Sequence, residues 1–180
     1  VGRPVVGEHV GGRGGLYAVV VDREVRRLHS AIRAALTTPR AGARRLIELG
    51  TLALLDYIDA CPDGFAIISR GSTASSSEGS FATILSDVAS RAEDLLAGEF
   101  AKSHFATPLA PMYAQMLVGL VALTGQWWLD TRESSPLDKE VVAAHVVNLA
   151  WNGMRHLEIA PVLARPRPVA VRPDSPEASA

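Results

Sequence analysis

The chain has 180 residues and a formal net charge of −1, and hydrophobic residues make up 48% of it. This composition is typical of one globular domain with a packed core; it excludes collagen-like and low-complexity classes, and no run of about 18 apolar residues predicts a membrane span. The single cysteine excludes a disulfide framework and a cysteine-based zinc site, so we expect a cytoplasmic protein without a bound metal.

The amino-terminal part of the chain is basic. Residues 1–50 contain nine arginines and four acidic residues, a net charge of +5, whereas residues 51–180 contain nine basic and fifteen acidic residues, a net charge of −6. A basic end on an acidic body is typical of a surface that faces a polyanion. Solvated, arginine-rich helix faces give the same pattern, so both interpretations stay open.

Apolar residues at helical spacing predict five helices, over 16–36, 39–61, 79–104, 108–132 and 136–158. Three of them start where a hydroxyl residue precedes proline, at Thr38-Pro39, Thr107-Pro108 and Ser135-Pro136. Residues 63–70 form either a short helical turn or a strand. The fold class is therefore all-α, with a loop at 71–77 and a proline-rich, disordered tail at 159–180.

The predicted helices differ in how their apolar residues are distributed. The helix at 79–104 is amphipathic, and its apolar face consists of Phe81, Ile84, Leu85, Val88, Ala92, Leu95 and Leu96. The last two helices are apolar almost all round, and such a helix must be covered on both sides. We therefore expect a carboxyl-terminal two-helix hairpin that packs on the body with one face and on a second copy with the other.

Two such hairpins related by a two-fold axis form a four-helix bundle across a homodimer. The residues expected in this interface are Leu120, Trp128, Val142, Val146, Leu149, Gly153 and Leu157. A monomer whose tail covers the hairpin is the alternative.

The segment from Gly2 to Tyr17 resembles the end of the DNA-binding domain of tetracycline-repressor-like (TetR family) regulators. The residues that keep the family's pattern are His9, Gly11, Gly12, Arg13 and Leu16. Residues 126–130 and 148–157 resemble the last two helices of family members from actinobacteria. The resemblance implies a ligand-responsive DNA-binding repressor, with residues 1–15 as the remnant of a helix-turn-helix domain and 16–158 as the ligand-binding and dimerisation domain.

The resemblance is incomplete at the amino terminus. Family members carry further helices ahead of this segment, and a recognition helix needs them to hold it in the DNA groove. Gly7, Val10 and Gly14 also depart from the family's pattern. We therefore expect this chain to be truncated and impaired in specific DNA binding. The alternative is a dimeric ligand-binding or interaction module without DNA-binding activity.

The resemblance also implies two sets of binding residues. The DNA-binding positions are Arg3, Pro4, Val5, Glu8, His9 and Arg13, and the partner is operator DNA where the missing helices are present. An unknown small apolar ligand is expected in a pocket between the helix at 16–36 and the central helices. Its expected lining is Tyr57, Phe65, Phe81, Leu85, Met112, Tyr113, Met116 and Trp127, with a plain core position as the alternative for each.

No pattern of catalytic residues is found. The five histidines share no metal-ligand spacing, and the glycine run at 11–15 is not a phosphate-binding loop. We therefore predict neither enzymatic activity nor a cofactor.

Overall fold

The computed structural model describes residues 12–70, 81–134 and 137–163. Over these ranges the chain is helical, without a strand, so the predicted all-α class is confirmed there. The helices are α1 (Gly12–Leu36), α2 (Ala43–Ala60), α3 (Pro62–Arg70), α4 (Phe81–Lys102), the 3-10 helix η2 (Thr107–Leu109), α5 (Ala110–Thr131) and α6 (Lys139–Arg155).

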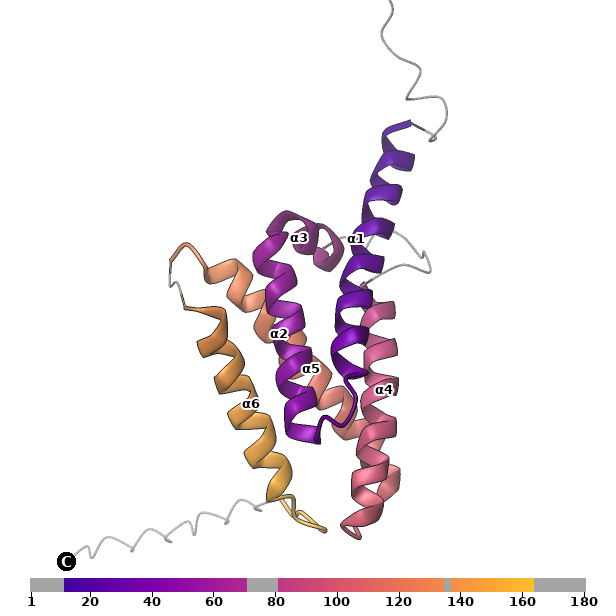
Figure 1. The fold of residues 1–180 in the computed structure, drawn as a ribbon, viewed down its shortest axis with the longest axis vertical. Coiled ribbons are helices and arrows are strands. Elements are labelled where there is room, and N and C mark those ends of the chain that lie inside the picture. The colour runs from indigo at the N-terminus through magenta and orange to yellow at the C-terminus, as the bar shows by residue number, and fades with distance from the viewer. Residues whose placement is uncertain (1–11, 71–80, 135–136, 164–180) are drawn as a thin grey trace, which may run out of the picture.

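The long helices run up and down the long axis of the molecule (Figure 1). α1 descends, α2 returns beside it, α4 descends again, and α5 and α6 form an antiparallel hairpin. The short helix α3 lies at the upper end, directly after α2. α1 extends beyond the other helices at its amino-terminal end, so its first turns stand clear of the body.

The main apolar core lies between α1, α2, α3 and α4 and reaches the hairpin. Leu28, Ile58 and Phe65 are completely buried there, and the Phe65 ring meets the Phe81 ring edge-on at a centroid distance of 5.5 Å. A second, smaller cluster lies at the turn between α4 and α5, around Phe100. These two clusters hold the five long helices in one body.

Polar contacts fix the start of α6 against α2. The Arg132 guanidinium lies 2.7 Å from the Asp59 carboxylate, and Lys139 Nζ lies 2.7 Å from Asp56. The Trp128 indole N–H donates a hydrogen bond to the Leu137 carbonyl at 2.8 Å, which fastens α5 to the segment that leads into α6. The hairpin is therefore tied to the body at its turn.

Several helix starts differ from the prediction. α2 begins at Ala43 rather than at Pro39, because Arg40 has a φ of 60° and a left-handed residue does not continue an α-helix. Thr107-Pro108 starts η2, which leads into α5 at Ala110. α1 begins at Gly12, earlier than predicted, and residues 62–70 form a helix rather than a strand.

Several predictions lie outside the described residues. These are the DNA-binding positions Arg3, Pro4, Val5, Glu8 and His9, the loop at 71–77 and residues 164–180 of the tail. The helix predicted from Pro136 begins at Lys139 instead, with Asp138 as its N-cap. Arg13 lies in the first turn of α1. Residues 159–163 of the tail follow α6 without regular secondary structure.

Candidate functional site

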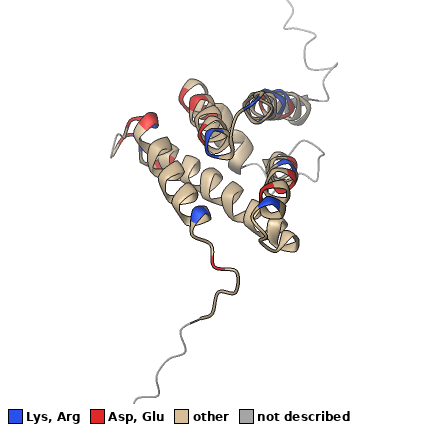
Figure 2. Ribbon diagram, turned by 60° about the horizontal axis from the view of Figure 1, so that its bottom comes forward, with Lys and Arg blue, Asp and Glu red and all other residues tan. Residues whose placement is uncertain are grey.

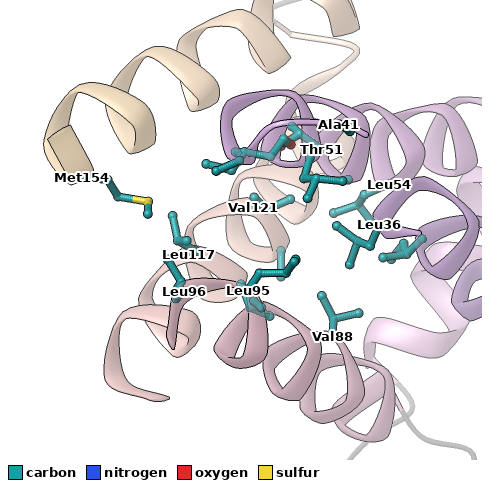
Figure 3. A pocket seen from close by; sticks show the side chains of 18 of the residues that line it. Leu36, Ala41, Thr51, Leu54, Val88, Leu95, Leu96, Leu117, Val121 and Met154 are labelled. Atoms are coloured by element: carbon teal, nitrogen blue, oxygen red, sulfur yellow. The ribbon is translucent and has the colours of Figure 1, made fainter. Parts of the chain in front are cut away.

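A cavity of about 430 Å³ lies between α1, α2, α4 and α5, and one residue of α6 reaches it (Figure 3). The wall that α4 contributes contains the whole predicted apolar face of this helix, namely Phe81, Ile84, Leu85, Val88, Ala92, Leu95 and Leu96. Opposite it, Leu36, Leu54 and Val121 point into the same space from α1, α2 and α5. Its size falls within the usual range for small-molecule sites.

The interior of this cavity is apolar. Thr51 is the one polar side chain among its buried lining residues, and its hydroxyl donates to the Ile47 carbonyl at 2.7 Å. Among the described residues, no buried side-chain nitrogen or oxygen lacks a hydrogen-bond partner. The inner surface therefore offers aliphatic contacts, and none of its described side chains has a buried hydrogen-bond donor without a partner.

Charged side chains border the cavity at one end only. Arg40, Glu99 and Lys102 line it there, and all three residues are exposed. Arg40 comes from the turn between α1 and α2, whereas the other two come from the last turn of α4. Lys102 Nζ pairs with the Glu99 carboxylate at 2.7 Å. Because Arg40 and Lys102 are exposed, we identify this end as the mouth.

The hairpin presents an apolar surface to solvent. The outward side chains of α5 are Met112, Met116, Leu123 and Trp127, between 45% and 68% exposed, and those of α6 include Val141 and Leu149. No charged residue lies between positions 110 and 129 of α5, and the central turns of both helices are uncharged in Figure 2. We call this surface the hairpin outer face.

Within the part of the chain that the structure describes, one segment, Thr107–Thr131, is long and apolar enough to cross a membrane by length and composition alone, and 28% of its most apolar window is buried inside the chain. The core helix of a soluble protein meets the same criterion when it is covered. In the single chain this helix is buried on one side only. Its buried side is a stripe of mostly small residues that ends at Trp128.

The structure brings only part of the predicted pocket lining together. Phe81 and Leu85 line the cavity, whereas Tyr57 and Phe65 are buried in the neighbouring core. Tyr113 packs against the rings of Phe100 and Phe105. Met112, Met116 and Trp127 lie away from the cavity on the hairpin outer face. The sequence was interpreted with the large residues of α5 facing inward, and the structure corrects this because small residues form its inner stripe.

Several residues that were predicted in the dimer interface are buried inside the chain instead. Trp128, Val142 and Val146 are buried in the chain's own core, so the structure corrects the expectation that they face outward. Leu120 and Leu157 are half-buried, and Leu149 and Gly153 are exposed on α6. The hairpin has an outward apolar face, as expected, but several residues assigned to its two faces exchange places.

The sequence reasoning missed the whole α1 and α2 lining, including Ile32, Leu46 and Leu54. Their helical spacing marked them as core residues without showing that a cavity lies beside them. It also missed the contact that joins these two helices. The Tyr57 hydroxyl donates a hydrogen bond to the buried Glu24 carboxylate at 2.8 Å, and Arg23 pairs with the same carboxylate at 3.0 Å. This donation by Tyr57 lowers the pKa of Glu24 despite its burial.

Comparisons with known proteins agree with this architecture. A family profile described as the C-terminal domain of tetracyclin repressor-like proteins matches residues 43–153, from the start of α2 to the last turn of α6. The chain is also similar to the HTH-type transcriptional activator FasR of Mycolicibacterium smegmatis. The two are 26% identical over 163 residues, which cover 88% of this chain and 71% of FasR.

Proposed function

The chain belongs to the tetracycline-repressor-like family of transcriptional regulators, and we propose that it is a ligand-responsive regulator that dimerises through the hairpin outer face. Regulators of this family are generally dimers that bind operator DNA and small ligands. Because operator DNA is the proposed target, we propose a cytoplasmic location as well.

The cavity carries the proposal of ligand response. Ile32 and Leu36 of α1 form part of its lining, so a bound ligand touches the helix that continues into the amino-terminal segment. That segment resembles the end of a DNA-binding domain. A ligand that prefers one position of α1 therefore changes how two amino-terminal segments are spaced in a dimer. Coupling of this kind typically amounts to about 1–3 kcal/mol.

Spin labels on α1 test this coupling. Leu16 is 55% exposed near the start of α1, so a Leu16→Cys, Cys61→Ser variant carries one label per subunit. We expect dodecanol, an aliphatic probe for the cavity, to change the label-to-label distance in double electron–electron resonance. In a Val88→Trp background, which fills the cavity, the distance should not respond to the probe. A saturating probe that leaves the distance unchanged would overturn the proposed coupling.

The hairpin outer face supports the dimer. An obligate interface resembles a core cut in half, and this face carries no charged residue over the central turns of both helices. Its α5 part is largely apolar, whereas on α6 the polar residues His145, Asn148 and Asn152 are exposed beside Leu149. A self-contact also suits it electrostatically, because two copies of an uncharged surface meet without repulsion. We therefore assign Leu120, Leu149 and Gly153 of the predicted interface to this contact, together with Leu123 and Trp127.

Sedimentation velocity at micromolar concentration tests the dimer. Leu123→Glu and Leu149→Glu each place a charge in the proposed contact, and we expect both variants to sediment as monomers while the unmodified chain sediments as a dimer. The control is Ala82→Glu, which adds the same charge at an exposed position of α4. Dimers that survive both hairpin substitutions would show that the contact lies elsewhere.

A further inference from the structure

We propose that the cavity binds an amphiphile with a long aliphatic chain and an anionic head group, and that Arg40 binds the head group at the mouth. The inference rests on the proposed ligand-binding role of the cavity and adds the chemical class of the ligand. Three features of the described residues carry it: the shape of the cavity, the chemistry of its interior and the placement of its charges.

The cavity is elongated along α4. Phe81 and Lys102 stand at opposite ends of α4 and both line it. A helix of 22 residues is about 30 Å long, at about 1.5 Å per residue. The cavity, of about 430 Å³, therefore extends along most of the length of α4. An extended chain fits such a space better than a compact ring system.

The interior favours a chain without polar groups. Leucine, isoleucine, valine and alanine side chains form most of the lining, and the Thr51 hydroxyl is already bonded to Ile47. A ligand hydroxyl or amide placed there would lose its water and find no side-chain partner, which is unfavourable. Far from the mouth, Phe81 lines the cavity next to the buried Phe65 ring.

The mouth supplies a cation for the other end of the ligand. Lys102 is paired with Glu99 at 2.7 Å, but no hydrogen-bond or ion-pair partner is found for the Arg40 guanidinium within the described part of the chain. Glu99 repels an anion, and its pairing with Lys102 offsets that repulsion. Arginine presents a planar set of donors that matches carboxylate and phosphate oxygens.

The backbone at Arg40 is unusual for a residue with a side chain. Its φ of 60° lies in the left-handed region. This conformation costs a residue with a side chain about 1–2 kcal/mol, whereas glycine adopts it readily. Glycine at this position would relieve that strain. The arginine side chain nevertheless stands at the entrance of an apolar cavity, where its charge serves no buried partner. A ligand anion gives it a partner.

Three ligands with one chain length separate head-group recognition from chain binding. Dodecanoate carries a carboxylate, dodecyl phosphate carries a phosphate, and dodecanol carries neither charge. By isothermal titration calorimetry below micelle formation, we expect at least one anion to bind about tenfold or more tightly than dodecanol, as charged hydrogen bonds imply. The preferred anion then identifies the head group as a carboxylate or a phosphate.

Variants at the mouth test Arg40 itself. We expect Arg40→Gln to remove the preference for the anion while dodecanol binding stays unchanged. Arg40→Gly should do the same and also raise thermal stability, which shows that lost binding is not lost folding. The matched control is Arg44→Gln, an exposed arginine that does not line the cavity. Val88→Trp should abolish binding of all three ligands.

The outcomes separate this inference from the proposed function. Dodecanol that binds as tightly as both anions, or an anion preference that survives Arg40→Gln, would overturn the head-group site and leave the ligand-binding role intact. A chain that binds none of the three ligands would overturn the inference and the ligand-binding role together. The sedimentation result for the dimer is independent of both.

Discussion

Glu24 places a carboxylate, 5% exposed, inside the contact between α1 and α2. The Tyr57 hydroxyl donates to it, which lowers its pKa, burial opposes this effect, and Arg23 lowers the pKa further. Since the folded-state pKa is lowered, this carboxylate stabilises the fold above its unfolded-state pKa. The contribution is lost as the pH falls through the folded-state pKa.

We expect Tyr57→Phe to reduce the free energy of unfolding near neutral pH by about 1–3 kcal/mol, because the buried carboxylate loses a donor. The difference from the unmodified chain should be smaller at an acidic pH below the folded-state pKa of Glu24, where the carboxyl is protonated in both proteins. Urea unfolding at the two pH values checks this, with Tyr17→Phe as the control because Tyr17 is 50% exposed. An equal loss at both pH values would contradict the role given to the charge.

Two helical glycines should respond to alanine with opposite signs. A Cβ added at Gly125 would lie 2.9 Å from Leu54 Cδ2 and 3.0 Å from Ile58 Cδ1, whereas one added at Gly98 meets nothing within 4 Å. We expect Gly125→Ala to destabilise the fold by about 1–3 kcal/mol through overpacking between α5 and α2. Gly98→Ala should stabilise it by up to about 1 kcal/mol through helix propensity. Thermal unfolding of both variants measures the two signs.

At the level of helices, the sequence predicts faces well where a helix has an opposing polar side. Every residue predicted on the apolar face of α4 lines the cavity, and the charged residues in the middle of the helix, Asp87, Arg91, Glu93 and Asp94, mark the other side. α5 has no such mark. Periodicity groups its residues into two stripes, but the choice of inner stripe depends on how closely α2 and α4 approach it. Ala114 and Gly125 allow that close approach, and the larger residues are left outside.

Trp127 and Trp128 allow the outer and inner sides of α5 to be compared by experiment. Trp128 is 4% exposed and its indole is bonded to the Leu137 carbonyl, whereas Trp127 is 47% exposed. We expect Trp128→Ala to reduce the free energy of unfolding by about 3–5 kcal/mol. Trp127→Ala should change monomer stability by about 0.5 kcal/mol or less but weaken association. Urea unfolding at low protein concentration and sedimentation separate the two effects, and similar losses of folding stability would contradict this orientation.

For the whole molecule, the distribution of charge sets the hairpin apart. α1, α2 and α4 carry charged residues along their exposed sides, whereas the central turns of α5 and α6 carry none (Figure 2). This contrast is visible in the sequence, and it led to the expectation of a dimer. The cavity could not be predicted in the same way, because its lining comes from helices far apart in the chain and depends on their spacing.

We expect the thermal unfolding midpoint of this chain to rise with protein concentration, because a dimer that forms only from folded chains stabilises them by mass action. In Leu149→Glu the midpoint should not depend on concentration. Differential scanning calorimetry over a wide concentration range tests this. A midpoint that stays constant in the unmodified chain would argue for a folded monomer.

The contact between Glu24 and Tyr57 has a mechanical consequence. Glu24 stands midway along α1, twelve residues from Gly12 and twelve from Leu36, so each arm is about 18 Å long at about 1.5 Å per residue. A rigid rod pivoting at its centre moves its two tips equally and in opposite directions. If α1 tilts about this contact as a rigid rod, a sideways displacement of its Leu36 end produces an equal and opposite displacement of its Gly12 end.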